Sequence, residues 1–361
     1  MADPKKVILH IGHGKTGSSA IQAVLARNQA LLGQAGILYP DHAMIDQARQ
    51  GAVTSGNLDP ENWFEGQVIP VARAAEGYDA ILFSNENLFH RFDEFLERQA
   101  AYADEFAFEI ILFVREPFEK LNSAYQQLVK RSGLSDGIGD FARHDADAAY
   151  AADILQALEG RGVPFALFNY SQLGRGAIRA FFQHLGVWDL LEREGVVEVG
   201  TVNRSLTAAE LDFLLHVNRV FGVAFGSVIA DALVHRLPDL APATAPIDAA
   251  TRKAFEDANR ASVATINRFL PEPDRLRFAI ADPGDDGADR RLSDDQVAVI
   301  QSVFPAALTY ADGVVLRDIA MKYETGEPLT REEGVALMQF AQKARPHGQI
   351  IAGKLKQWRD S

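Results

Sequence analysis

The sequence contains no cysteine, and this absence removes several classes of chemistry at once. A chain of 361 residues without a thiol forms no disulfide, offers no thiolate nucleophile and holds no cysteine-ligated zinc ion or iron–sulfur cluster. Long apolar runs are also missing, and none approaches the roughly 20 residues that a membrane-spanning helix requires. We therefore expect no membrane span and, as the simplest interpretation, a cytoplasmic protein.

Positive charge is scarce as well. The 36 basic residues face 49 acidic ones, which gives a formal net charge of −13. Nucleic acids and anionic membranes are bound by clustered positive charge, so neither is an expected partner. A small anion in one local pocket is still compatible with this charge. The apolar share of 47% is typical of a globular protein and excludes wholesale disorder.

The first 190 residues alternate short apolar runs with helical patterns, which is typical of βαβ units around a mainly parallel sheet. The runs that predict strands are 7–11, 80–84, 109–114 and 163–168. Helical patterns are found at 18–32, from Pro117 onward, near 148–158 and at 175–185. We expect an α/β fold in residues 1–220, with a mainly parallel central sheet in a three-layer sandwich.

The pattern changes beyond residue 200. Thr207 and Glu210 form a capping box at the start of one predicted helix. Helical periodicity returns near 248–269, 293–303 and 331–344. We expect residues 221–361 to form a mostly helical region that packs on the α/β core and contributes to its binding pocket.

The segment richest in chemistry is Ile11-Gly-His-Gly-Lys-Thr-Gly-Ser-Ser19, between the first predicted strand and the first predicted helix. A helix N-terminus offers unpaired N–H groups and the positive end of a dipole, and glycines let a phosphate approach the backbone closely. Lys15 adds a positive charge, and Thr16, Ser18 and Ser19 add hydroxyl donors. This combination predicts a phosphate-binding loop.

Two known phosphate motifs compare poorly with this loop. A Walker A loop requires glycine at position 9, where this chain has Leu9. The dinucleotide fingerprint G-x-G-x-x-G is met at residues 12–17, with Asp41 near the place of a ribose-binding acid. Against it, the residues between the glycines are Lys-Thr rather than small and apolar, and Pro40 cuts the second strand short. Because the fingerprint itself is matched, an NAD(P)-dependent dehydrogenase is kept as the alternative function.

The segment Lys15-Thr-Gly-Ser-Ser19 resembles the 5′-phosphosulfate loop of the sulfotransferases that use 3′-phosphoadenosine 5′-phosphosulfate (PAPS), and in particular their bacterial branch. That loop runs Lys-[Ser/Thr/Gly]-Gly-[Ser/Thr]-[Ser/Thr] after the first strand. The family's 3′-phosphate signature, a strand-end Arg followed eight residues later by a Ser, is matched by Arg115 and Ser123. A guanidinium and a hydroxyl so placed can hold one phosphate from two sides.

A third match is Leu167-Phe-Asn-Tyr-Ser-Gln-Leu173, which resembles the family's Tyr-Glu-Asp-Leu segment, whose Tyr contacts adenine. Only Tyr170 carries over, because Ser-Gln replaces the acidic pair. The resemblance covers about residues 5–215. The Arg-Lys-Gly loop with which cytosolic members complete the 3′-phosphate site is missing, and Arg204 or a basic residue of the C-terminal part is a candidate replacement.

The resemblance implies transfer of a sulfuryl group from PAPS, by in-line displacement, to a hydroxyl or amine of a carbohydrate, lipid or small metabolite. The residues that it assigns to PAPS binding are Lys15, Thr16, Gly17, Ser18, Ser19, Arg115, Ser123 and Tyr170. Lys15 is also expected to stabilise the charge that develops on the bridging oxygen of the donor. The co-product is 3′,5′-adenosine diphosphate, and no metal site is predicted.

A group must also take the acceptor's proton. The candidates are Glu86 just past the strand at 80–84, His13 inside the loop, and His42 after the second strand. Glu86 follows a strand end, where α/β proteins form their sites. Two plainer interpretations stay open: a phosphate-binding module without catalysis, and an Arg115 that only pairs with Glu116 or Glu119.

Overall fold

The computed structural model describes residues 4–12, 14–52, 54–197, 204–278, 290–307, 309–325 and 330–360. Their contacts divide the chain into two units. The first comprises residues 1–125, 137–202 and 246–283, and the second comprises 126–136, 203–245 and 284–361.

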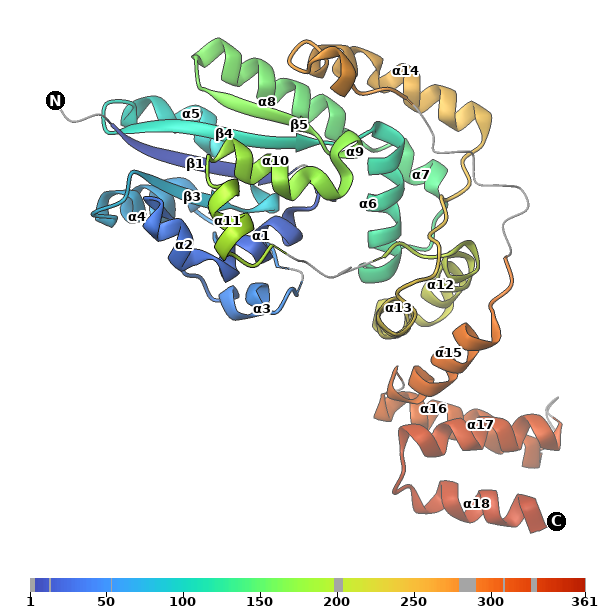
Figure 1. Cartoon of the computed structure of the whole chain (residues 1–361). Coiled ribbons are helices and arrows are strands. Elements are labelled where there is room, and N and C mark those ends of the chain that lie inside the picture. Colours follow the sequence, from blue (N-terminus) through green and yellow to red (C-terminus); the bar gives the residue numbers. More distant parts are fainter. Residues whose placement is uncertain are drawn as a thin grey trace. The chain divides into compact units, whose positions relative to one another are not determined.

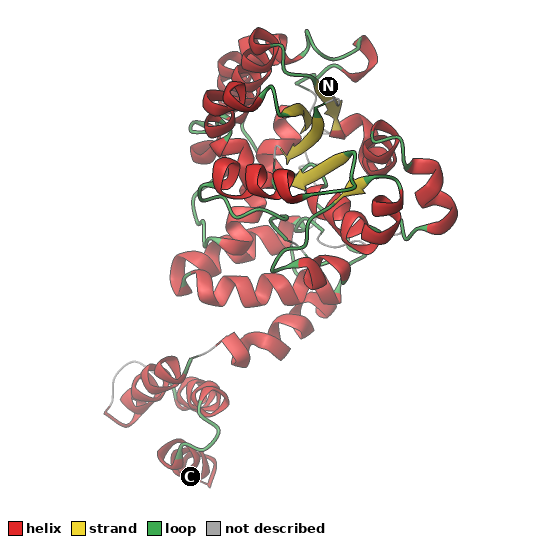
Figure 2. Cartoon of the chain, turned by 90° about the vertical axis from the view of Figure 1, so that its left-hand side faces the viewer, coloured by secondary structure: helices red, strands yellow, loops and turns green. Residues whose placement is uncertain are grey.

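Five parallel strands form the sheet of the first unit (Figures 1 and 2). The strands are β1 Lys5–Gly12, β2 Ile37–Leu38, β3 Ala80–Ser84, β4 Phe106–Val114 and β5 Phe165–Asn169. Their order is β2-β3-β1-β4-β5. The predicted α/β fold with a mainly parallel sheet is confirmed, and all carboxyl ends lie at one edge, where sites form in such sheets.

Helices cover both faces of this sheet (Figure 1). Their bounds are α1 Ser18–Arg27, α2 Gln29–Gln34, α3 Ile45–Arg49, α4 Ile69–Ala74, α5 Asp93–Arg98, α6 Pro117–Arg131, α7 Ile138–Ala142, α8 Asp147–Arg161, α9 Tyr170–Leu173, α10 Ala177–His184, α11 Trp188–Glu194 and α14 Ala249–Ile266. Short helices with other hydrogen-bond patterns are η1 Phe64–Val68, η2 Glu86–Arg91, η3 Gln99–Tyr102, η4 Gly174–Gly176 and η5 Glu272–Asp274.

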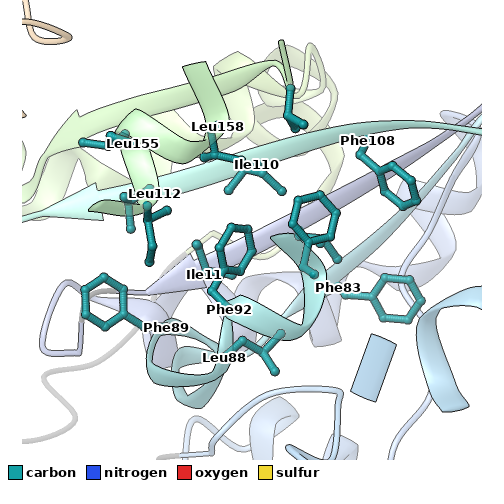
Figure 3. Close-up of a cluster of buried hydrophobic side chains, with 14 of the residues drawn as sticks. Ile11, Phe83, Leu88, Phe89, Phe92, Phe108, Ile110, Leu112, Leu155 and Leu158 are labelled. Carbon is teal, nitrogen blue, oxygen red and sulfur yellow. The ribbon is translucent and has the colours of Figure 1, made fainter. Parts of the chain in front are cut away.

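Side chains of β4 alternate between two apolar clusters, as the two-residue period of a strand requires. Ile110, Leu112 and Val114 join the cluster under α8 and α14, part of which is drawn in Figure 3. Ile111 and Phe113 join the cluster under α1, α10 and α11. The sheet is thus buried on both faces, which explains why its strands read as continuous apolar runs.

The helix predicted over 18–32 is in fact two helices, α1 and α2, which meet at Asn28. The buried Asn28 side chain donates to the carbonyl oxygens of Val24 and Val196, at 2.7 and 3.0 Å. Such a side chain competes with the helical backbone for hydrogen bonds, and this competition accounts for the break.

The second unit is built from helices. They are α12 Ala208–Phe221, α13 Val223–Arg236, α15 Asp294–Ala307, α16 Tyr310–Met321, the short η6 Lys322–Thr325, α17 Arg331–Ala344 and α18 Gln349–Asp360, and this unit also takes the last residues of α6. The predicted capping box of Thr207 and Glu210 is present. Among the described residues, no helix has both the length and the apolar character needed to cross a membrane.

The boundary predicted at residue 220 differs from this division. Residues 203–245 belong to the helical unit, whereas 246–283 belong to the α/β unit. Residues 246–283 belong to the α/β unit because α14 packs on the core of the sheet. Its residues Val263 and Ile266 are buried in the same cluster as the apolar residues of α8. A helical pattern alone does not show against which core a helix packs.

A short segment at Gly56 holds the end of β3. Gly56 forms an antiparallel bridge with Asn85, and the neighbouring Asn57 side chain accepts a hydrogen bond from the Ser84 N–H at 2.8 Å. Gly56 has a φ of 116°, and a Cβ there would lie 1.8 Å from the Ser84 carbonyl oxygen. Only glycine fits this position, and the contact sets the path of the chain into Glu86.

We expect Gly56→Ala to destabilise the α/β unit by more than about 3 kcal/mol, because the added methyl group displaces the end of β3. Gly160→Ala is the matched control, since no atom lies within 4 Å of a Cβ there and the site is inside α8. The control is expected to raise stability by about 0.5–1 kcal/mol. Denaturant unfolding measures both, and equal stabilities would contradict the assigned role of Gly56.

Candidate functional site

The loop between β1 and α1 has an unusual backbone. Lys15 has a φ of 72° and Gly17 a φ of 80°, so both lie in the left-handed region. This conformation costs free energy for a lysine, and such strain is concentrated at ligand-binding loops. Gly17 is the N-cap of α1, and no side chain in the described part of the chain caps that helix end. The first N–H groups of α1 are therefore left to another acceptor.

Thr16 provides the clearest sign of a missing acceptor. Its side chain is fully buried, and its Oγ1 has no hydrogen-bond partner among the residues that the structure describes. A buried hydroxyl without a partner costs about 1–3 kcal/mol, so native proteins rarely leave one without a reason. An oxygen of a bound phosphate or sulfate would satisfy this hydroxyl together with the open end of α1. The residues of the loop thus fit the group that the resemblance implies.

Arg115 joins the loop to the end of β4. Its Nη1 donates to the carbonyl oxygen of Lys15 at 3.0 Å, and its Nε donates to Glu119 Oε2 at 3.1 Å. Of the two acidic neighbours considered as ion-pair partners, Glu119 is therefore the one that pairs with Arg115. The arginine nevertheless does more than form a salt bridge, because it also binds the strained residue of the loop.

Tyr170 brings in a third strand end. Its ring packs against Gly17, where an added Cβ would lie 2.8 Å from Cε2 of the tyrosine. The Arg115 guanidinium carbon lies 5.5 Å from the centre of the same ring, within the range of a cation–π contact. The ends of β1, β4 and β5 thus bring the three predicted motifs into mutual contact.

Glu86 also reaches this loop. The Ser18 hydroxyl donates to Glu86 Oε2 at 2.6 Å, and a Cβ on Gly12 would lie 3.3 Å from Glu86 Cβ. Of the two candidate proton acceptors that the structure describes, Glu86 and His42, Glu86 is the one in contact with the loop. His13 lies outside the described residues.

The remaining predicted residues differ in their places. Ser19 is the last residue of the loop and lies in the first turn of α1, Ser123 lies in α6, and both are half-buried. His42 follows the edge strand β2, its Nδ1 accepts the Met44 N–H at 3.3 Å, and burial lowers its pKa. Arg204 belongs to the helical unit, where it is paired with Glu210 through two hydrogen bonds of 2.7 Å. Because this pair is buried, Arg204 is a structural residue and not the replacement for the missing 3′-phosphate loop.

The strand order bears on the dinucleotide alternative. In the fold that carries the G-x-G-x-x-G fingerprint, the strand order is 3-2-1-4-5-6, so the strand before the ribose-binding acid lies next to the first strand. Here β3 separates β1 from β2, and Asp41 follows β2. The Asp41 carboxylate accepts a hydrogen bond from Gln29 at 3.0 Å. The topology therefore disfavours a dinucleotide site at this loop.

Sequence reasoning considered Glu116 only as an ion-pair partner of Arg115 and gave Asn169 no role. Glu116 and Asn169 each stand next to a predicted site residue, and both are buried. The Asn169 amide donates to the Asp274 carbonyl at 2.9 Å, and the Arg277 N–H donates to Glu116 Oε2 at 2.7 Å. The signal available in the sequence was an acidic residue directly after the strand-end Arg115. These bonds fix the segment that follows α14 to the carboxyl ends of β4 and β5.

Comparisons with models of known protein families, with curated proteins and with solved structures gave no match.

Burial raises the pKa of Glu116 from 4.5 to about 7. The folded protein therefore holds more protons than the unfolded chain between about pH 4.5 and 7, and this group's contribution to stability falls as pH rises through that window. Glutamine does not titrate, so we expect the free energy of unfolding of Glu116→Gln, relative to that of the natural protein, to be about 2 kcal/mol higher at pH 8 than at pH 5. Denaturant unfolding at both pH values measures this difference.

The exposed Glu272→Gln is the control, because its carboxylate lies in η5 near the same segment. Its stability relative to the natural protein is expected to be the same at both pH values. A Glu116→Gln difference that does not change with pH would show that Glu116 does not titrate in this window.

Proposed function

We propose that the protein is a sulfotransferase that moves a sulfuryl group from PAPS to a hydroxyl or amine of a carbohydrate, lipid or small metabolite. The observation that carries this proposal is the mutual contact of Lys15, Gly17, Arg115 and Tyr170 at the ends of β1, β4 and β5. The three motifs were selected by sequence resemblance alone, from positions far apart in the chain. Their convergence supports a common ligand.

The chemistry of the donor set agrees with a nucleotide that carries phosphate and sulfate. Lys15 and Arg115 supply charge, the open end of α1 supplies N–H donors, and Thr16 supplies a hydroxyl that lacks an acceptor. The aromatic ring of Tyr170 offers a surface for a base beside them. PAPS, when bound, provides the activated sulfuryl group.

The residues of the chain have separate tasks in this proposal. The loop residues Lys15–Ser19 hold the phosphosulfate, and Arg115 with Ser123 holds the 3′-phosphate. Lys15 stabilises the negative charge that grows on the bridging oxygen as the sulfuryl group leaves. Glu86 is a candidate for the proton acceptor. It contacts the loop, where one of its carboxylate oxygens accepts a hydrogen bond from the Ser18 hydroxyl.

We expect Lys15→Ala to weaken binding of 3′,5′-adenosine diphosphate by about 10- to 100-fold, since a hydrogen bond to a charged group contributes about 1.5–3 kcal/mol. Turnover of PAPS is expected to fall by about 100- to 1,000-fold. Titration calorimetry and a labelled-sulfate assay over acceptor classes measure the two effects. Lys253→Ala, an exposed lysine of α14 paired with Asp257, is the control and should change neither. Full turnover in Lys15→Ala would refute the role of Lys15.

The dehydrogenase alternative makes a different prediction. A ligand at 100 times its dissociation constant stabilises the folded state by about 2.7 kcal/mol. We therefore expect 3′,5′-adenosine diphosphate, but neither NADH nor NADPH, to raise the thermal unfolding temperature. Protection by the nicotinamide nucleotides alone would favour the alternative.

A further inference from the structure

A second cluster of polar side chains lies at the carboxyl edge of the sheet, on the side that α8 covers. Its members are His90 in η2, Lys120 in α6, Asp145 just before α8, and Asp147 at the start of α8. The apolar residues of η2 and α8 share one core cluster, whereas α1 lies over the other face. His90, Asp145 and Asp147 are outside the predicted nucleotide motifs, whereas Lys120 lies in the sequence between Arg115 and Ser123.

Asp147 is held in a fixed orientation by a lysine. Lys120 Nζ forms an ion pair with Asp147 Oδ2, and the two side chains are only 7% and 18% exposed. Removing one partner of a buried ion pair is strongly unfavourable, so this contact keeps the carboxylate in place. Asp145 lies near both groups, and burial raises the pKa of its carboxyl to about 6.

The other oxygen of Asp147 faces His90. The distance from His90 Nε2 to Asp147 Oδ1 is 3.7 Å. The imidazole stacks on Tyr150, with ring centres 5.8 Å apart and planes 25° apart, and it meets Phe89 edge-on. Even so, 64% of the His90 side chain is exposed. The ring is therefore oriented on one side and accessible on the other.

At 3.7 Å the carboxylate is within ion-pair distance of the imidazole, close enough to orient it as a base. In the tautomer with its hydrogen on Nε2, the nitrogen nearer Asp147 is the donor and Nδ1 carries a lone pair. Such an imidazole can accept a proton at Nδ1, and Asp147 then stabilises the imidazolium that forms.

The short helix η2 connects this cluster to the loop. It begins at Glu86, which touches Gly12 and accepts the Ser18 hydroxyl, and His90 follows four residues later. A helix of this type rises about 2 Å per residue, so the two residues are about 8 Å apart along its axis. One oxygen of Glu86 is already engaged by the loop, whereas the exposed face of His90 is open to an incoming molecule.

We propose that His90, oriented by Asp147, is the residue that takes the acceptor's proton. This inference rests on the proposed function. The acceptor oxygen or nitrogen forms a bond to sulfur while the bond from sulfur to the bridging oxygen breaks. The proton passes to Nδ1 of His90, and 3′,5′-adenosine diphosphate leaves with the electron pair. His90 is then a catalytic residue, and Asp147 and Lys120 are positioning residues.

The test compares the natural protein with His90→Ala. Release of 3′,5′-adenosine diphosphate from PAPS is followed with an acceptor from the labelled-sulfate assay, or with water as acceptor. We expect kcat to fall by about 100- to 10,000-fold while the affinity for 3′,5′-adenosine diphosphate stays within about twofold. Added imidazole should raise the kcat of His90→Ala at least about tenfold, because the exposed position lets imidazole take the place of the missing ring. His144→Ala, which removes an exposed histidine directly before Asp145 in the sequence, is the control and should keep the full rate.

A second variant tests the orienting carboxylate. Asp147→Asn is expected to lower kcat by about 10- to 100-fold at unchanged nucleotide affinity, and imidazole should not restore its rate, since His90 is still present. A purely structural role of Asp147 would instead alter nucleotide affinity and turnover together.

Each outcome separates this inference from the proposed function. If the natural protein does not bind 3′,5′-adenosine diphosphate, the proposed function is refuted. If it binds this nucleotide but does not convert PAPS to it with any acceptor, catalysis and the role of His90 are refuted together. A His90→Ala variant that keeps its rate within about threefold, or that imidazole does not rescue, overturns the role of His90 alone. If Glu86→Gln shows the loss instead, proton transfer belongs to Glu86.

Discussion

The hydrogen bond from Arg115 to the carbonyl oxygen of Lys15 is the interaction on which the candidate site depends. Lys15 is in the left-handed region, a conformation that needs support from its surroundings. Arg115 gives that support from the end of β4, and Tyr170 packs on Gly17 from the end of β5. The parallel sheet makes this possible, because it brings the carboxyl ends of β1, β4 and β5 to one edge.

Local charge at this edge differs from the charge of the whole chain. The net charge of −13 describes a surface that repels polyanions. At the loop, a lysine, an arginine and an uncapped helix end are gathered within one small region. Glu119 and Ser171 share a hydrogen bond beside Arg115, so that the guanidinium is held in one orientation even without a ligand. A preorganised arginine loses less entropy when it binds an anion.

Much of this arrangement could be predicted from the sequence, because the strands of the buried sheet are marked by continuous apolar runs. The positions of β1, β3 and β4 followed from this pattern, and so did the loop after β1. Sequence reasoning failed where the decisive contact is tertiary. Arg204 stands among motif-like residues, but its guanidinium forms a buried ion pair with Glu210. His90 has no sequence signal, because its meaning comes from Asp147, which belongs to a different helix.

The central claim is that one nucleotide site spans the loop, Arg115 and Tyr170, and a crystal structure with 3′,5′-adenosine diphosphate tests it most directly. We expect a phosphate oxygen within hydrogen-bond distance of Thr16 Oγ1 and the N–H groups at the start of α1, the second phosphate at Arg115, and the base beside Tyr170. A nucleotide bound elsewhere on the chain, with the Thr16 hydroxyl still unpaired, would contradict it.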